Sequence, residues 1–239
     1  MSLKPPAAPA PASELLDRDV WIFDLDNTLY SADCDLFSQV RVKMGEFISR
    51  TFSITLDEAR ALQRKYFLEY GTTLRGLMTV DGIDPTDYLT YVHDIDLNVI
   101  GPDAGLAAAL KQLPGRKLIF TNASTDHAER VLDRLGIADQ FEAIFDVAAA
   151  SYIPKPHQGP YDTLIQTFGV TPSRAAMVED MPQNLEPAHA MGMTTVLVET
   201  SHDWGVDGRT APHVHHVVED LPRWLAELAR KTSQPTTGD

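Results

Sequence analysis

The stretch VWIFDLDNTLY (residues 20–30) places two carboxylates at the end of an apolar run. Its first four residues are largely apolar, as in a strand that is covered on both faces of a sheet. Asp24 and Asp26 follow at once, separated by a single leucine. Two like charges at this spacing repel each other and gain nothing from burial, so we expect something to compensate them.

Length and composition narrow the classes of protein to consider. The chain has 239 residues, enough for one large domain or for a domain with an insertion. Its formal net charge of -14 is spread along the sequence, which argues against non-specific binding to nucleic acid or to an anionic membrane. The single cysteine, Cys34, allows no intrachain disulfide and favours a reducing compartment.

The N-terminal segment MSLKPPAAPAPASELL is rich in proline and alanine and lacks the apolar centre of a signal peptide. We expect residues 1–15 to form a disordered lead-in. No apolar run in the sequence is long enough to span a membrane. Together these features predict a cytoplasmic protein.

Short apolar runs alternate with amphipathic segments through most of the chain. Strands are expected at 20–23, 117–120, 175–178, 194–198 and, less strongly patterned, 213–218. Helices are expected near Asp103 and after Ser124, Gly159, Asn184 and Leu221. Strands that alternate with helices predict an α/β fold with a parallel sheet and right-handed crossovers.

The interval between the first two sheet strands breaks this alternation. Residues 31–102 carry three amphipathic stretches, FSQVRVKMGEFISRTF, LDEARALQRKYFLEYG and DPTDYLTYVHDI, and no strong strand. A simple crossover needs far fewer residues. The sequence therefore predicts a helical cap inserted into a core made of residues 16–30 and 103–239. Because the cap begins directly after the paired aspartates, we expect it to lie over them.

Carboxylate, hydroxyl and amide side chains, which can take part in catalysis or ligand binding, follow the ends of several predicted strands. Asp24, Asp26 and Thr28 follow the first strand, and the stretch TNAS (121–124) follows the second. Glu179 and Asp180 end a later strand, and a lysine, Lys155, lies between two prolines. Because open α/β sheets bind ligands at these ends, the groups should meet. Several carboxylates suit Mg²⁺, and a lysine with hydroxyl donors opposite the metal can hold a phosphate.

In this order the groups resemble the four signatures of the haloacid dehalogenase-like (HAD) phosphohydrolases. DLDNTLY is similar to the DxDxT signature, and Thr121-Asn122, Lys155 and Glu179-Asp180 follow in sequence. Any one of these motifs alone is weak evidence, whereas four in the right order and spacing are specific. The resemblance implies a Rossmann-like core, a Mg²⁺ cofactor and hydrolysis of a phosphate ester.

The same resemblance implies a role for each matched residue. Asp24 is expected to be the nucleophile, and Asp26 the general acid and base. Thr121 and the backbone amide of Asn122 are expected to bind phosphoryl oxygens, with Lys155 neutralising charge on the nucleophile and the phosphate.

Further roles concern the metal. The resemblance implies that Mg²⁺ is ligated by Asp24, Asp180 and the backbone carbonyl of Asp26. Supporting roles are implied for Thr28, Glu179 and Asn184. Dehalogenase members of the superfamily usually lack the second aspartate, so Asp26 favours phosphate chemistry.

Within the cap, KYFLEYGTTLRGL (65–77) resembles the corresponding stretch of the HAD pyrimidine 5′-nucleotidases. This implies a pyrimidine nucleoside monophosphate such as UMP or CMP as substrate. Residues 70–75 are expected to form a loop of the cap, and its Tyr70, Thr72, Thr73 and Arg75 are then expected near the nucleotide. Tyr70 would stack on a ring, and Arg75 would reach a phosphate or a base carbonyl. Packing within the cap is an alternative for Tyr70, as is solvation for Arg75.

The expected partner is a small phosphorylated metabolite, bound by a monomer or a homodimer. Three alternatives stay open: a phosphatase for a sugar phosphate or phosphoglycolate, a phosphoglucomutase-like phosphotransferase, and a non-catalytic protein that binds a phosphorylated ligand. A substrate panel, isomerised product without free phosphate, and tight binding without turnover would distinguish them.

Overall fold

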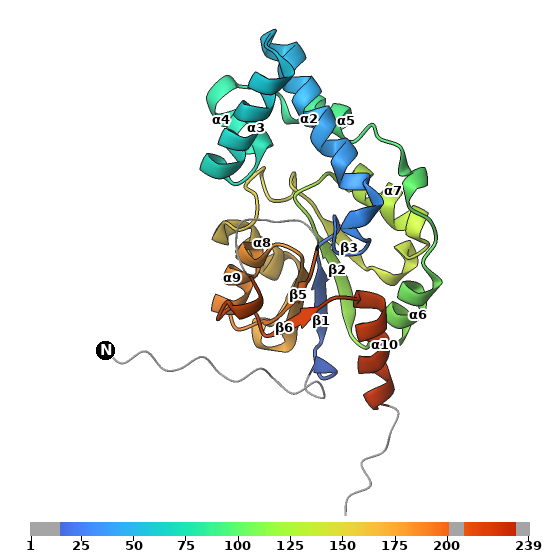
Figure 1. Cartoon of the computed structure of the whole chain (residues 1–239). Helices are drawn as coiled ribbons and strands as arrows, with labels where there is room; N and C mark the ends of the chain where they lie inside the picture. Colours follow the sequence, from blue (N-terminus) through green and yellow to red (C-terminus); the bar gives the residue numbers. More distant parts are fainter. Residues whose placement is uncertain (1–14, 201–207, 233–239) are drawn as a thin grey trace, which may run out of the picture.

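A computed structural model describes residues 15–200 and 208–232 and shows a parallel sheet with helices on both faces (Figure 1). In this described part the six strands run in the order β3-β2-β1-β4-β5-β6, all parallel. Their bounds are β1 Val20–Phe23, β2 Arg116–Phe120, β3 Ala143–Phe145, β4 Ala175–Glu179, β5 Thr194–Val198 and β6 His216–Val218. The predicted α/β class is confirmed.

Two strands differ from the sequence prediction by more than one residue. β3 was not predicted, because it has only three residues and two of them are half-buried. β6 begins at His216 rather than at His213. The residues before it are held differently, since the Thr195 hydroxyl donates to the backbone carbonyl of His213.

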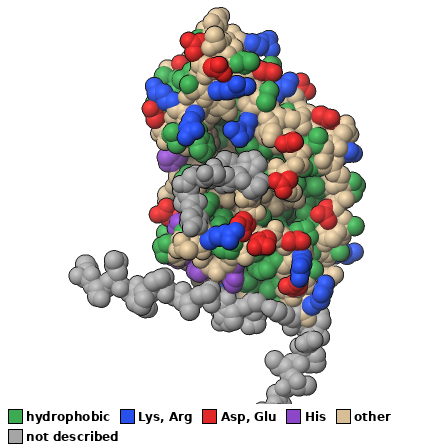
Figure 2. Space-filling model, viewed as in Figure 1, with side chains coloured by type: hydrophobic (Ala, Val, Ile, Leu, Met, Phe, Trp, Pro, Cys, Tyr) green, Lys and Arg blue, Asp and Glu red, His purple; other side chains and the backbone are tan. Residues whose placement is uncertain are grey.

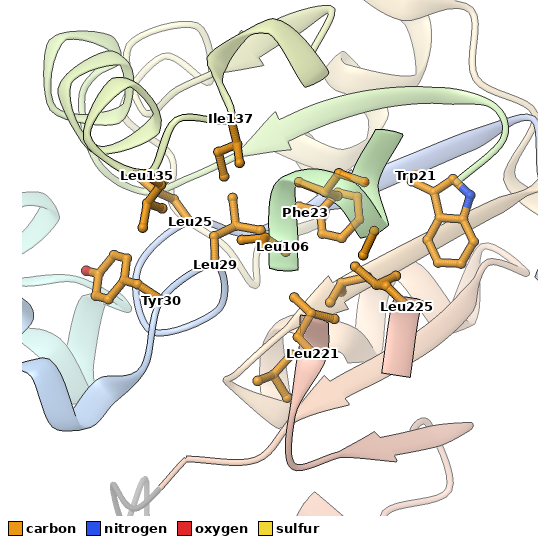
Figure 3. Close-up of a cluster of buried hydrophobic side chains, with 14 of the residues drawn as sticks. Trp21, Phe23, Leu25, Leu29, Tyr30, Leu106, Leu135, Ile137, Leu221 and Leu225 are labelled. Carbon is orange, nitrogen blue, oxygen red and sulfur yellow. The ribbon is translucent and has the colours of Figure 1, made fainter. Parts of the chain in front are cut away.

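Alternating side chains of β1 enter two separate cores. Trp21 and Phe23 lie in the core under α6 (Ala104–Gln112), α7 (Thr125–Leu135) and α10 (Leu221–Thr232). Figure 3 shows both rings among leucines of α6 and α10. Val20 and Ile22 lie in the opposite core, under α8 (Gln158–Phe168) and α9 (Pro182–Ala190). Each fully buried side chain of this size contributes about 1.5–3 kcal/mol, so both faces of β1 must be covered.

Local signals set the helix ends near the site. The side chains of Asp103 and Ser124 cap α6 and α7 as predicted, and Gly136 ends α7 in a left-handed conformation (φ 71°). α9 begins at Pro182 rather than after Asn184, because proline is well suited to the first turn of a helix. Asn184 therefore lies inside the first turn of α9.

The chain reverses its direction across the sheet at β1. From β1 it moves outward through β2 and β3, then returns to β4 on the other side of β1 and continues to β5 and β6. This is a topological switch point, where open α/β sheets form a crevice beyond the strand ends. The residues that follow β1, β2 and β4 therefore share one edge.

The cap lies over this edge and has its own core (Figure 1). It contains four α-helices, where three amphipathic stretches were predicted: α2 Leu36–Phe52, α3 Leu56–Tyr70, α4 Thr73–Asp81 and α5 Pro85–Val92. α4 escaped prediction because it is short and contains a glycine. Tyr66, Leu77 and Tyr88 are buried between these helices. Figure 2 shows basic and acidic side chains interspersed on the outer surface of the cap.

Residues 1–14 of the predicted lead-in lie outside the described residues, and Leu15 packs into the core instead of belonging to that segment. Among the helices of the described chain, none has both the length and the apolar character needed to cross a membrane.

Gly76→Ala is expected to destabilise the cap. A Cβ at Gly76 would lie 2.3 Å from Cγ of Tyr66, whose ring is buried and whose hydroxyl donates to Asp81. Overpacking of this kind costs about 1–3 kcal/mol. The matched control is Gly45→Ala in α2, where the nearest atoms are 3.9 Å away; alanine there should stabilise by about 0.5–1 kcal/mol. Urea denaturation measures both, and equal shifts would contradict the packing described.

Candidate active site

Asp24 is held rigidly at the carboxyl end of β1. Its backbone N–H donates to the Val178 carbonyl over 2.9 Å, which extends the pairing of β1 with β4 by one residue. Its side chain is buried and accepts two hydrogen bonds, from Lys155 Nζ at 2.6 Å and from the Thr28 hydroxyl at 3.1 Å. Thr28 thus contacts the predicted nucleophile directly.

Lys155 compensates the buried carboxylates. Lys155 is 2% exposed, and its ammonium donates to Asp24 Oδ1 (2.6 Å), Glu179 Oε2 (2.6 Å) and the Phe120 carbonyl (2.8 Å). Three donors therefore meet three acceptors, as a buried charge requires. Burial alone would lower the pKa of Lys155, but the charges of Asp24 and Glu179 outweigh it and raise that pKa.

Asn122 fixes the backbone that carries this lysine. Its side-chain oxygen accepts from the Lys155 N–H at 2.9 Å, and its amide nitrogen donates to the Lys155 carbonyl at 3.4 Å. The segment after β2 therefore positions the lysine as well as ending at the site. Thr121 is buried beside it, and its hydroxyl accepts from the Ala123 N–H.

Carboxylate oxygens of Asp24, Glu179 and Asp180 lie within 4.8 Å of one another. Burial and the charge of Glu179 raise the pKa of Asp24 to about 7, against the opposing effect of Lys155. Burial and the same neighbour also raise the pKa of Asp180. One buried oxygen, Asp180 Oδ2, has no hydrogen-bond partner in the described chain. One lysine cannot neutralise three carboxylates, so this hard-oxygen group fits a divalent cation.

Asp26 points to a different set of partners. Its Oδ1 accepts from His127 Nε2 at 2.9 Å and from the Tyr30 hydroxyl at 2.6 Å. Burial would raise the pKa of Asp26, but the His127 ring and these hydrogen bonds outweigh it, so the pKa lies below the usual value. Asp26 is absent from the carboxylate group around Asp180. Its separate surroundings suit a group that exchanges protons.

Sequence reasoning missed three of these contacts. Tyr30 and His127 as partners of Asp26 and the Asn122 clamp on Lys155 were not predicted. A signal existed for Tyr30, which lies four residues after Asp26 within the same motif. His127 is 101 residues from Asp26 and carries no local pattern that names its partner.

The remaining supporting residue, Asn184, is buried in α9, and its backbone carbonyl accepts from the Tyr161 hydroxyl at 2.5 Å. This bond ties α9 to α8 just behind the loop of Asp180. Glu179 is bonded to Lys155 and accepts from the Met181 N–H at 3.3 Å. Both residues thus fix the segment that follows β4.

The corner between α3 and α4 brings part of the cap to the site. A Cβ placed on Gly71 would lie 3.4 Å from Pro154 and 3.9 Å from the Lys155 carbonyl, so the corner approaches the lysine segment closely. Tyr70 and Thr72 flank this glycine. Tyr70 packs edge-on against Tyr66 at 5.8 Å, and the Thr72 hydroxyl caps α4 by accepting from the Arg75 N–H.

The other two predicted cap residues lie on α4 rather than in a loop. Thr73 is buried and its hydroxyl donates to the Gln63 carbonyl at 3.3 Å, so that group is already used within the cap. Arg75 is half-buried and lies in the first turn of the helix. Of the four residues, Tyr70 and Thr72 are thus nearest in sequence to the close approach at Gly71.

Asp24→Asn is expected to stabilise the metal-free protein above neutral pH. The folded-state pKa of Asp24 is about 7 against 3.8 for a free carboxyl, so folding favours the protonated form. The contribution of this preference to the free energy of unfolding is fully present at pH values below the unfolded pKa, and it is lost as the pH rises through about 7. Asparagine buries no charge, and Lys155 keeps its other acceptors.

The variant should therefore exceed the wild type in free energy of unfolding by about 1–3 kcal/mol near pH 8 and by little near pH 4.5. Urea denaturation with a chelator present measures the difference. A variant that is less stable than the wild type near pH 8 would show that Asp24 is not destabilised by its neighbours.

Comparison with known proteins agrees with this geometry. Residues 19–192 match the family model described as haloacid dehalogenase-like hydrolase. Phosphate metabolism protein 8 of Saccharomyces cerevisiae is 31% identical over 209 residues, which cover 81% of this chain and 64% of the yeast protein. The chain thus spans less than two thirds of that relative.

Other relatives are named for different activities. (S)-2-haloacid dehalogenase of Xanthobacter autotrophicus is 24% identical over 74% of this chain and 73% of its own length. Phosphoglycolate phosphatase of Pasteurella multocida is 23% identical over 85% and 91%, respectively. The HAD-hydrolase YfnB of Bacillus subtilis, a crystal structure bound to magnesium, shares the fold with a TM-score of 0.58 at 12% identity, over 88% of this chain and 98% of its own. The chain belongs to the haloacid dehalogenase-like hydrolases.

Proposed function

We propose that this hydrolase is a Mg²⁺-dependent phosphatase that cleaves small phosphate monoesters through a phospho-Asp24 intermediate, with pyrimidine nucleoside 5′-monophosphates as its substrates. The observation that carries the proposal is that Asp24 and Asp26 have different hydrogen-bond partners. Asp24 lies in the lysine and carboxylate cluster, whereas Asp26 is held apart by His127 and Tyr30. A nucleophile and a separate proton carrier are what phosphoester hydrolysis requires.

The first step forms a bond between an Asp24 oxygen and phosphorus and breaks the ester P–O bond. Lys155 lies against Asp24 and offsets negative charge as the phosphoryl group arrives. Asp26 gives a proton to the departing ester oxygen. The pKa of Asp26 is low before substrate binds, and the negative charge of the entering phosphate raises it, which favours the protonated form.

The second step returns Asp24 to its starting state. Water attacks phosphorus, the bond to Asp24 breaks, and Asp26 accepts the proton that the water loses. The low pKa that His127 and Tyr30 give Asp26 suits this step, because the base must be ionised. Asp24, Asp180 and the backbone carbonyl of Asp26 are the proposed ligands of Mg²⁺, which supplies positive charge to the phosphoryl oxygens when bound.

The cap supports the proposed substrate class. The α3–α4 corner approaches the lysine segment closely at Gly71, and Tyr70 and Thr72 are the neighbours of this glycine in the chain. An aromatic ring in this place can stack on a base, and a hydroxyl can bond a base or a sugar. Residues 65–77 also resemble the pyrimidine nucleotidases. The phosphoglycolate phosphatase relative makes phosphoglycolate the second candidate substrate.

Asp24→Asn is expected to lower Mg²⁺-dependent phosphate release by about 10³-fold or more, because the amide does not attack phosphorus. Phosphate release by the wild type should stop with a chelator and return with added Mg²⁺. The matched control is Asp57→Asn on the exposed face of α3, which should leave activity unchanged. Near-normal turnover by Asp24→Asn would refute the phospho-aspartate assignment.

A substrate panel tests the assignment of the cap. Phosphate release should be fastest from UMP, CMP, dUMP or dTMP and slower from AMP, GMP, phosphoglycolate and hexose phosphates. L-2-chloropropionate should release no chloride, because Asp26 favours phosphate chemistry. Preference for phosphoglycolate would retain the catalytic site and refute the nucleotide assignment, whereas chloride release would refute the phosphatase.

A further inference from the structure

A buried histidine from α7 holds Asp26. His127 is 0% exposed, and its Nε2 lies 2.9 Å from Asp26 Oδ1. Because an ionised carboxylate only accepts hydrogen bonds, Nε2 carries the proton in this contact. A histidine in a wholly buried position usually serves packing, but here its nitrogen is directed at the proposed acid and base.

Both hydrogen bonds to Asp26 converge on one oxygen. His127 and Tyr30 each donate to Oδ1, at 2.9 and 2.6 Å. No described residue donates to Oδ2. The carboxylate is therefore fixed through one oxygen, which leaves the other available to exchange a proton with the substrate oxygen or with water.

The His127 ring packs against His93, a cap residue at the C-terminal end of α5. His93, which follows α5, stacks on His127 with ring centroids 4.3 Å apart and planes inclined by 17°. His93 Nδ1 lies 2.9 Å from the Ser124 hydroxyl, and its carbonyl accepts from Arg130 Nη2 at 2.9 Å. Ser124 caps α7 and Arg130 lies within it. These hydrogen bonds therefore attach the C-terminal end of α5 to the helix that carries His127.

The stack restricts how His127 can turn. Its Nδ1 has no hydrogen-bond partner in the described chain, so only the contact with Asp26 and the packing of the ring determine its orientation. The face against His93 supplies that packing. Loss of the stack should therefore loosen the histidine and, through it, the carboxylate.

We propose that His127 is a positioning residue for Asp26, holding Oδ1 so that Oδ2 faces the reacting oxygen, and that His93 extends this control to the end of the cap. The inference rests on the proposed phosphatase function. It makes the proton-transfer step depend on two residues that lie outside the carboxylate group proposed to hold the metal.

The test compares two substitutions of the same histidine. His127→Gln keeps an N–H near the position of Nε2, so it can still donate to Asp26. His127→Asn keeps an N–H only near the position of Nδ1, which has no hydrogen-bond partner in the described chain, so it loses the bond to Asp26. His127→Asn should lower kcat/KM for UMP on the order of 10²-fold, and His127→Gln should stay within a few-fold of the wild type. Urea midpoints of both variants report on folding.

The leaving group separates positioning from simple structural damage. p-Nitrophenyl phosphate releases a phenolate that needs no proton, so His127→Asn should lose much less kcat/KM on this ester than on UMP. His93→Ala should show the same substrate-dependent loss to a smaller degree, and His93→Phe, which keeps a stacking ring, should be closer to the wild type. His189→Asn on α9 is the control and should change neither ester.

Each outcome has a distinct meaning. Equal losses on the two esters, or equal behaviour of the Gln and Asn variants, would overturn the positioning role while leaving the phosphatase intact. If the wild type released phosphate from neither ester, or if Asp24→Asn released it as fast as the wild type, the proposed function would fail and the positioning role with it.

Discussion

The contact of Lys155 with Asp24 and Glu179 is the interaction on which the rest of the site depends. A buried ammonium between two buried carboxylates is stable only if all its donors are used, and here the Phe120 carbonyl takes the third. These acceptors come from the ends of β1, β2 and β4, and the lysine comes from the segment after β3. One side chain therefore ties together the strands that meet at the switch point of the sheet.

Lys155 does not neutralise all the negative charge of the group formed by Asp24, Glu179 and Asp180, and this remaining charge fits a bound cation. Among the described residues, Asp180 keeps a buried oxygen without a hydrogen-bond partner beside Asp24 and Glu179, which costs free energy unless a cation binds it. Asp26, the second aspartate of the DLDNTLY motif, has hydrogen-bond donors of its own, because its side chain accepts from His127 and Tyr30. Two carboxylates only two residues apart thus acquire opposite pKa shifts, which is the basis for assigning them different chemical roles.

The cap contacts the core near Lys155 and at His127, the hydrogen-bond partner of Asp26. Its α3–α4 corner lies against the lysine segment, and His93, which follows its helix α5, stacks on the histidine that holds Asp26. A cap with its own core behaves as a separate body, so its contacts with the catalytic core are the places where its position can affect chemistry. In this protein those contacts involve Gly71, His93 and Tyr152, which packs against the core of the cap.

The sequence by itself determined the α/β class, the helical insertion after β1, and the order of charged groups at the strand ends. These features are written in short stretches, because apolar periodicity and capping residues act over only a few positions. The tertiary structure decided what each group contacts: His127 with Asp26, Asn122 with Lys155, and Thr73 with the interior of the cap rather than with a loop. Such contacts join segments far apart in the chain, and their geometry follows from how the helices pack on the sheet, which no local pattern encodes.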